Sequence, residues 1–387
     1  MATSEVRAAH PSEPSDTSVR YCSSCVVSDQ RPRITFDENG VCSACTYAAR
    51  KKAKIDWDQR ESELLELLDR RRRNDGTYDV IVPCSGGKDS SAIAHQLKHQ
   101  YGMHPLTVTW APNMWTDIGW QNLKAFVDSG FDNVLGMPAG DVNRRLARVA
   151  LEEMGDPFLP FIYGVKAFPI RMAIQHGVKL IMYAEDGEVE YGGDNKNADS
   201  PSIDLAQDMV RQYFSGHEPE KWVDHGFTLE ELQPYRLPPY EQMIEADLDY
   251  RYFAYYKKWI PQENYYYAAE HCGFQANPMR SQGTYSKYAS LDDKLDGLHY
   301  YFMFIKFGIG RATSDAAHEI RDGHLTREEG VALVRKYDGE FPLRHFEDCL
   351  EYLGLSRARF DEIVDRFRSP NVWRKEGDEW SLRSQVV

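Results

Sequence analysis

Three features are absent from this sequence of 387 residues, and each absence excludes a class of protein. No window approaches the roughly 18 consecutive apolar residues of a membrane-spanning helix, so no membrane partner is expected. Positive charge is not in excess: 46 Lys and Arg residues stand against 60 Asp and Glu residues, and the net charge of −14 argues against a general nucleic-acid-binding protein. Residues 1–20 have no apolar core beside basic residues, which argues against a secretory signal and for a cytoplasmic protein.

Cysteine is scarce and unevenly distributed. Four of the seven cysteines form two pairs, Cys22-Ser-Ser-Cys25 and Cys42-Ser-Ala-Cys45, separated by sixteen residues. An odd total with one cluster does not fit the disulfide scaffold of a secreted protein. The spacing predicts a structural Zn²⁺ site with four thiolate ligands; an iron–sulfur cluster or redox dithiols are the alternatives. The remaining cysteines have no recognisable nucleophile context; they are Cys84, Cys272 and Cys349.

Short apolar strands alternate with helical segments through the first half of the chain. Strands are expected at residues 79–84, 104–110, 133–138 and 179–184, and helices at 53–73, 90–100, 117–129, 142–154 and 165–176. This alternation predicts an α/β fold with a parallel sheet covered on both faces. After about residue 200 no further strand is expected. Helices are predicted there at residues 291–307, 314–321, 326–337, 343–353 and 356–368.

A glycine-rich loop, Pro83-Cys-Ser-Gly-Gly-Lys-Asp-Ser-Ser91, follows the first expected strand and opens a helix. Its two glycines permit a close approach of the backbone to an anion, and the free N–H groups at a helix start bind phosphate. The Walker A pattern is not met, because Val82 and Asp89 stand where Gly and Ser or Thr are required. The remaining pattern, S-G-G-x-D-S, resembles the pyrophosphate loop of the PP-loop ATP pyrophosphatases.

The residue types of this loop suit the release of pyrophosphate from ATP. Backbone N–H groups, the Lys88 ammonium and the Ser90 hydroxyl can stabilise the negative charge of the leaving group. Asp89 is a candidate Mg²⁺ ligand, because Mg²⁺ prefers carboxylates together with phosphate oxygens; it would also stabilise the helix N-terminus. The residues predicted to bind ATP are Ser85, Gly86, Gly87, Lys88, Asp89 and Ser90.

An acidic segment follows the fourth expected strand and contains Glu185, Glu188, Glu190 and Asp194. Ligands of open α/β sheets bind beyond the carboxyl ends of the strands, so this segment is expected to face the same crevice as the loop. Its carboxylates suit a metal or a polar, sugar-like ligand, and a solvated acidic loop is the alternative.

Aromatic and basic side chains interleave over residues 250–259 and 265–271, followed by Arg280, Lys287 and Lys294. Such segments can stack on bases, but tyrosines equally pack a polar domain interface, which is the favoured interpretation. The three basic residues are candidates for phosphate or carboxylate contacts. His271 has no matching metal spacing and is predicted to be structural.

Several longer strings resemble the N-acetyl sugar amidotransferase family of surface-polysaccharide biosynthesis, from about Tyr21 to the C-terminus. Besides the paired cysteines and C-S-G-G-K-D-S, they are E-x-G-E-x-E-Y-G-G-D (185–194), Y-R-Y-F-x-Y-Y-K-K-W (250–259), G-T-Y-S-K-Y (283–288), H-Y-Y-x-x-F-I-K-F-G-I-G-R-A-T (299–313), E-E-G-V-A-L-V-x-K-Y-D-G-E-F-P (328–342) and F-R-S-P-N-V-W (367–373). Ala184 and Asp186 depart from the pattern, where Gly and Asn are more usual, which leaves the exact substrate open.

The resemblance implies a Rossmann-like PP-loop domain of the adenine nucleotide alpha-hydrolase type. The expected domains are a disordered tail (1–20), a four-cysteine zinc module (21–50), a PP-loop ATP-binding α/β domain (51–240) and a helical C-terminal domain (241–387). Catalytic roles are assigned to Lys88, Asp89, Glu185 and Lys287. Substrate contacts are assigned to Glu188, Glu190, Asp194, Arg280 and Lys294.

The resemblance also implies a reaction in lipopolysaccharide or pseudaminic acid biosynthesis: conversion of a sugar acetamido group to an acetamidino group. ATP with Mg²⁺ would adenylate the amide oxygen and release pyrophosphate, after which ammonia displaces AMP. The substrate is an N-acetylated sugar or sugar nucleotide. Because the chain shows no glutaminase module, ammonia is expected from a partner glutaminase through a barrel subunit resembling those of imidazole glycerol phosphate synthase.

Two alternative functions remain open. A PP-loop tRNA thiolase can also carry cysteine knuckles, but the net charge of −14 and the lack of a catalytic cysteine pair beyond residue 45 argue against it. The second alternative is a non-catalytic zinc module with a degenerate nucleotide loop.

Overall fold

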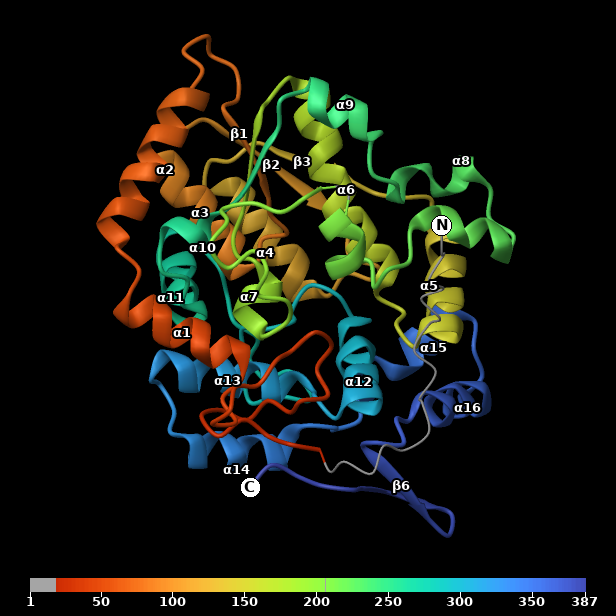
Figure 1. Cartoon of the computed structure of the whole chain (residues 1–387). Coiled ribbons are helices and arrows are strands. Elements are labelled where there is room, and N and C mark those ends of the chain that lie inside the picture. The colour runs from red at the N-terminus through yellow and green to blue at the C-terminus, as the bar shows by residue number, and fades with distance from the viewer. Residues whose placement is uncertain (1–18, 206) are drawn as a thin grey trace, which may run out of the picture.

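A sheet of five parallel strands lies at the centre of the computed structural model, which describes residues 19–205 and 207–387 (Figure 1). The strands are β1 (Val80–Pro83), β2 (Pro105–Trp110), β3 (Asn133–Gly136), β4 (Leu180–Tyr183) and β5 (Asp249–Tyr252). Their order across the sheet is β3-β2-β1-β4-β5, and every neighbouring pair is parallel. The expected disordered tail lies, apart from residues 19 and 20, outside the described residues.

The four strands predicted from the sequence are confirmed, but the expectation that strands stop after about residue 200 is wrong. β5 extends the parallel sheet, and β6 (Trp373–Glu376) and β7 (Glu379–Leu382) form a separate antiparallel hairpin. β5 is hidden in the sequence because its buried side chains, Tyr250 and Tyr252, belong to a long tyrosine-rich stretch. Both rings pack into the sheet's main core, so the strand depends on tertiary contacts.

Sixteen α-helices occur in the described residues, and most match the predicted ranges. They are α1 (Ser43–Ala53), α2 (Trp57–Arg71), α3 (Lys88–His99), α4 (Asp117–Asp128), α5 (Gly140–Met154), α6 (Leu159–His176), α7 (Gly187–Tyr191), α8 (Leu229–Leu232), α9 (Tyr240–Glu245), α10 (Phe253–Tyr256), α11 (Pro261–His271), α12 (Asp296–Phe307), α13 (Arg311–Asp322), α14 (Arg327–Tyr337), α15 (Phe346–Leu353) and α16 (Arg357–Phe367). Shorter turns include a π-helix (Met209–Tyr213) and 3-10 helices at Pro219–His225, Gln233–Tyr235 and Leu343–His345. Thr326 and Glu329 form a capping box at the start of α14, and Ser356 is the N-cap of α16.

Helices cover both faces of the sheet, as expected for parallel strands whose residues are almost all apolar. Ile81 points into a core with Ile170 of α6, whereas its neighbours Val80 and Val82 face a second core with Leu97 of α3. Figure 1 shows α2 and α3 on one side of the strands and α5 and α6 on the other.

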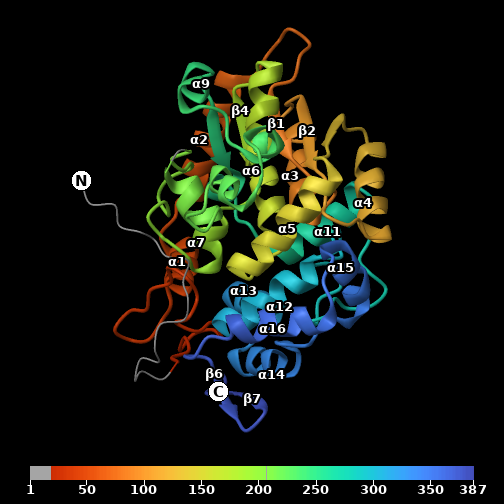
Figure 2. The same cartoon turned by 90° about the vertical axis from the view of Figure 1, so that its right-hand side faces the viewer.

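The C-terminal helices and the four-cysteine module (residues 21–50) pack together next to the sheet domain. Figure 2 shows α12, α13, α14 and α16 below the α/β part of the molecule. The four cysteines share one hydrophobic core with Ile309 and with residues of α13 and α14. The four-cysteine module and the C-terminal region, far apart in the sequence, therefore pack against each other.

The strand order reverses beside β1. From β1 the chain moves outward to β2 and β3, and then returns to place β4 on the other side of β1. In open α/β sheets the ligand crevice lies at such a switch point, outside the carboxyl ends of the strands. The glycine loop follows β1 and the acidic segment follows β4, so both border this crevice.

Replacement of Gly164 tests the packing of α6 on the sheet. An added Cβ would lie 2.0 Å from the indole of Trp110, the last residue of β2. We expect Gly164→Ala to lower the free energy of unfolding by about 1–3 kcal/mol, because the buried ring must move. Gly140→Ala is the matched control, since a Cβ there meets only one atom, at 3.9 Å. Urea denaturation measures both, and equal stability of the two variants would contradict the close contact.

Candidate functional site

Four cysteine sulfurs meet near the N-terminus. The Sγ atoms of Cys22, Cys25, Cys42 and Cys45 all lie within 4.8 Å of one another, and all four residues are buried. The Cys25–Cys42 and Cys22–Cys45 sulfurs are 3.7 and 3.9 Å apart. A disulfide bond would be about 2.05 Å long. Four sulfurs placed about 2.3 Å from a tetrahedral Zn²⁺ lie about 3.8 Å apart, which matches the observed spacing.

Backbone amides support the thiolate form of the first ligand. The N–H groups of Ser24, Cys25 and Cys42 all point to Cys22 Sγ, at 3.4, 3.4 and 3.2 Å. Hydrogen-bond donors that contact a ligand atom in this way orient it and offset its negative charge. The cluster therefore fits a closed structural Zn²⁺ site with four protein ligands.

The four-cysteine module is docked on α7 by ion pairs. Arg33 donates from Nε and Nη2 to the two oxygens of Glu188, at 2.8 and 2.6 Å. Lys51, the next residue after the module, contacts both carboxylate oxygens of Glu190 at 2.8 and 2.6 Å. Glu188 and Glu190 are only 6% and 4% exposed. The structure therefore directs these two predicted substrate residues toward the module.

Two arginines of the C-terminal helices close the same interface from the other side. Arg321 of α13 donates to the Glu190 carbonyl at 3.0 Å. Burial lowers the pKa of Arg321, but the nearby cysteine sulfurs outweigh this effect and the pKa is raised. Arg327 of α14 donates to the carbonyl oxygens of Cys25 and Cys22, at 3.1 and 3.2 Å. The module thus connects α7 to the C-terminal helices.

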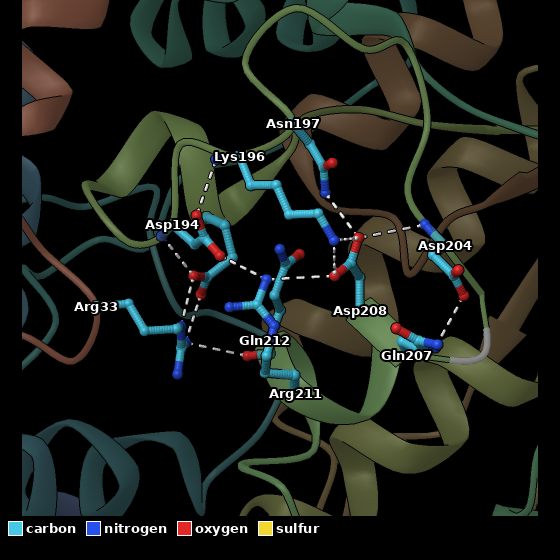
Figure 3. Close-up of polar contacts among 10 residues, drawn as sticks. Arg33, Asp194, Lys196, Asn197, Asp204, Gln207, Asp208, Arg211 and Gln212 are labelled. Atoms are coloured by element: carbon cyan, nitrogen blue, oxygen red, sulfur yellow. Dashed lines mark hydrogen bonds and ion pairs between the residues drawn. The ribbon is translucent and has the colours of Figure 1, made fainter.

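Asp194 belongs to a polar network beside this interface (Figure 3). Its carboxylate lies 2.5 Å from Arg211, which also contacts Asp208 at 3.2 Å. Lys196 and Asn197 both donate to Asp208, whose side chain is 2% exposed. Asp194 is therefore placed among structural partners, and its role in substrate binding stays a prediction.

The glycine loop turns tightly against α4 and leaves the start of α3 without a side-chain cap. Gly86 has a φ of +81°, and an added Cβ would lie 2.5 Å from the Leu123 backbone. Gly87 is the N-cap of α3, and among the described residues no side chain caps this helix start. Its first N–H groups can therefore bind phosphate oxygens.

Two of the three serines of the loop, Ser85 and Ser90, lie on either side of this turn. The Ser90 hydroxyl donates to the Gly87 carbonyl at 3.2 Å, which braces the first turn of α3. Ser85 forms a hydrogen bond with Asp292, whose pKa is raised chiefly by burial.

Asp89 is held by three donors. Its Oδ2 lies 2.6 Å from Lys88 Nζ, and its Oδ1 accepts from Trp259 Nε1 at 3.0 Å and from Asn264 Nδ2 at 2.9 Å. The carboxylate is thus fixed at the helix start and keeps free lone pairs for a cation. It could hold Mg²⁺ together with phosphate oxygens.

Glu185 stands two residues after the end of β4 and lies near Lys88 and Asp89 of the glycine loop. Burial, with a smaller contribution from the negative charge of Asp89, raises its pKa to about 8, while Lys88 and Lys166 oppose the shift. The structure therefore brings Glu185 together with the loop, as expected from the sheet topology. A carboxyl group with this pKa is mostly protonated at neutral pH and can exchange a proton there.

The C-terminal region supplies the opposite wall of the crevice. One pocket is lined by Lys88 of the loop, Tyr191 of α7, and Tyr288 and Arg311 from the C-terminal region. The Lys88 ammonium lies 5.8 Å from the centre of the Tyr288 ring. Arg311 is fixed by Asp315, at 3.0 Å. Lys88 and Arg311 thus meet in one pocket, whose lining also includes the carboxylates of Asp315, Glu319 and Asp322.

Three predicted basic residues lie elsewhere. Arg280 forms a bidentate ion pair with Glu340, at 2.6 and 2.8 Å. Lys294 contacts Asp348 at 2.8 Å, and Lys287 is exposed. Their roles in binding or catalysis stay predictions.

Sequence reasoning missed several residues of the site, chiefly Arg311, Tyr191, Trp259 and Asn264. Arg311 and Trp259 stand within strings quoted above, 299–313 and 250–259, but nothing in their spacing links them to the loop. Only the fold brings them to within reach of it.

Fold and site together define an α/β protein with a glycine-rich loop at the switch point of a parallel sheet and a four-cysteine cluster that could hold a metal ion. Residues 282–386 match a family described as LPS biosynthesis protein WbpG-like, C-terminal domain. This match supports an enzyme role in polysaccharide biosynthesis, and the matched range contains Tyr288 and Arg311. A comparison with curated proteins found no match. Across residues 19–205 and 207–387, no helix has the length and apolar character needed to cross a membrane.

Replacement of one zinc ligand tests the metal site and its connection to α7. We expect wild-type protein to hold about one Zn²⁺ per chain and Cys22→Ser to lose it, because three thiolates leave the tetrahedral site open. Backbone amides of residues 187–191 should then exchange faster with deuterium, since the module that holds α7 is loosened. Atomic emission and hydrogen exchange measure the two effects. Cys349→Ala, in a separate core, is the control; unchanged zinc content in Cys22→Ser would contradict a structural site.

Proposed function

We propose that the protein is an ATP-dependent amidotransferase that converts the acetamido group of an N-acetyl sugar to an acetamidino group. The observation that carries the proposal is the pocket shared by Lys88 and Arg311. There, a pyrophosphate-type loop meets a region similar to lipopolysaccharide biosynthesis proteins. This juxtaposition supports a nucleotide and a sugar substrate reacting in one crevice.

The loop and its neighbours would bind and activate the nucleotide. The N–H groups at the start of α3 and the Lys88 ammonium would hold the pyrophosphate that leaves. Asp89 would hold Mg²⁺, which supplies positive charge to the phosphates. Arg311, fixed by Asp315, would orient a phosphate from the opposite wall.

The chemistry requires activation because an amide oxygen is a poor leaving group. Transfer of AMP to this oxygen releases pyrophosphate, and ammonia then displaces AMP to leave the amidine. The chain's remaining cysteines do not offer a glutaminase nucleophile: burial raises the pKa of Cys84, and that of Cys272 and Cys349 to about 12. We therefore propose that a partner glutaminase supplies the ammonia through a barrel subunit.

Mass spectrometry of the sugar product tests the reaction. Purified protein is incubated with ATP, Mg²⁺, ammonium chloride and a panel of N-acetyl sugars and their nucleotide-linked forms. We expect pyrophosphate release that depends on the sugar, and a product about 1 Da lighter, because oxygen is replaced by an imino nitrogen. Asp89→Asn should lower pyrophosphate release by about 10²-fold or more, since it removes a charged group at the reacting phosphates.

Asp378→Asn, in the exposed hairpin turn, is the matched control and should keep full activity. ATP binding without pyrophosphate release, for every sugar tested, would contradict the proposal and favour a non-catalytic nucleotide-binding module. Tight, salt-sensitive binding of tRNA would instead favour a tRNA-modifying enzyme.

A further inference from the structure

An aromatic cavity of about 520 Å³ is lined by residues of α2, α3, α10 and α11 and of the segment between α10 and α11. Among the described residues it shares no lining residue with the pocket of Lys88 and Arg311. Its volume falls within the range of small-molecule sites, roughly 300–1,000 Å³. Five aromatic side chains line it: Trp57, Phe253, Tyr256, Trp259 and Tyr267. The reaction proposed above assigns no role to this cavity.

The aromatic rings are held in place from outside the cavity. The centre of the Trp259 ring system lies 6.0 Å from that of Tyr191 and 5.0 Å from that of His318. Trp57 Nε1 donates to the Lys51 carbonyl at 3.0 Å. In the described part of the chain, the ring pairs formed by the five side chains are all with residues outside the cavity. The rings therefore present a pre-formed aromatic surface to a ligand.

Polar groups with unused hydrogen-bonding capacity lie among the rings. The half-buried side chain of Gln96 forms no hydrogen bond within the described residues, and that of Glu263 forms neither a hydrogen bond nor an ion pair there. Asn264 donates from Nδ2 to Asp89 at 2.9 Å, and no described residue donates to its carbonyl oxygen. The cavity thus offers both donors and acceptors to a polar ligand.

The charged groups of the cavity nearly cancel. Three carboxylates, of Asp58, Glu61 and Glu263, stand against the two ammonium groups of Lys257 and Lys258. Glu61 and Lys257 already form an ion pair at 2.8 Å. A phosphate-rich ligand would gain little from this balance. A neutral sugar fits it better, because the C–H faces of a pyranose pack flat on aromatic rings and its hydroxyls both donate to and accept from amides and carboxylates.

We propose that the aromatic cavity binds a neutral saccharide, which stacks on Trp57 and Trp259 and forms hydrogen bonds with Gln96 and Asn264. The site goes beyond the reaction proposed above, since a sugar can bind there without ATP. It also adjoins the glycine loop: Trp259 and Asn264 both donate to the Asp89 carboxylate, at 3.0 and 2.9 Å. A bound saccharide is therefore coupled to Asp89 through these two side chains.

Fluorine NMR of the full chain labelled with 5-fluorotryptophan tests the site. The eight tryptophans give eight signals, and single replacements by Phe assign them. The probes are the methyl β-glycosides of glucose, galactose and N-acetylglucosamine. At least one should shift the Trp57 and Trp259 signals with a Kd of about 1 mM, the affinity expected of a ligand of this size. The signal of Trp120, which is 50% exposed and lies outside the cavity, should not move.

Two results of this titration would overturn the inference. One is the absence of any shift of the Trp57 and Trp259 signals with every sugar at about 50 mM, far above the expected Kd. The other is a shift of both signals by uridine and by none of the sugars, which would identify a site for a nucleobase.

Trp57→Ala and Trp120→Ala form a matched pair of variants. Trp57→Ala should weaken sugar binding about tenfold, as followed by the Trp259 signal, because one stacking face is lost. Trp120→Ala should bind as wild type does. Gln96→Leu keeps the size of the side chain but removes its amide, and should weaken binding about fivefold without touching α2. Wild-type affinity in both Trp57→Ala and Gln96→Leu would overturn the site.

Asp89→Ala tests the coupling to the glycine loop. This change removes the shared acceptor of Trp259 and Asn264, so the sugar should bind about threefold more weakly or worse. Asp378→Ala, in the exposed hairpin turn, is the control and should bind as wild type does. Unchanged affinity in Asp89→Ala would overturn the coupling. Absence of pyrophosphate release from wild type would overturn the proposed reaction and not the sugar site.

Discussion

The ion pair between Arg33 and Glu188 is the contact on which the rest of the site depends. It joins residues 155 positions apart and places two hydrogen bonds inside the protein. Glu188 also accepts from the Asp194 N–H at 2.9 Å, so one carboxylate fixes both ends of the segment around α7. Loss of one partner would leave a charge buried without compensation, which proteins tolerate poorly. The four-cysteine module is held to the sheet domain through this pair and its neighbour, Lys51 with Glu190.

The position of α7 matters because its last residue, Tyr191, lines the pocket shared by Lys88 and Arg311. Glu185 comes just before this short helix and Tyr191 ends it. The cysteine cluster therefore lies outside the pocket, but it influences the pocket because the four-cysteine module holds α7 in place. The C-terminal helices contact the module as well as the pocket, so three segments remote in sequence define one site.

Local patterns in the sequence predicted those parts of the fold that local interactions determine. The apolar strands, the helix caps and the paired cysteines each leave a signal within a few residues, and the structure contains them. β5 left no such signal, because its tyrosines resemble the rest of residues 250–267 and become a strand only by pairing with β4.

The candidate site shows the same difference between residues that a local pattern predicts and residues that only long-range contacts position. Glu185 could be placed from the rule on strand ends, and the structure brings it to the loop. Glu188 and Glu190 carry the same composition signal, yet their side chains turn to Arg33 and Lys51. Composition alone does not show which way a carboxylate points, and the partners lie more than 130 residues away.

The packing of the four-cysteine module on the C-terminal helices has a consequence for how the protein is made. The cysteine pairs leave the ribosome before the α13 and α14 surfaces that bury them, which are translated nearly 300 residues later. At about 5–20 residues per second, the thiols wait roughly 15–60 s without their final cover. During that interval early capture of zinc would protect them from oxidation, so metal supply and the speed of translation together influence the yield of folded protein.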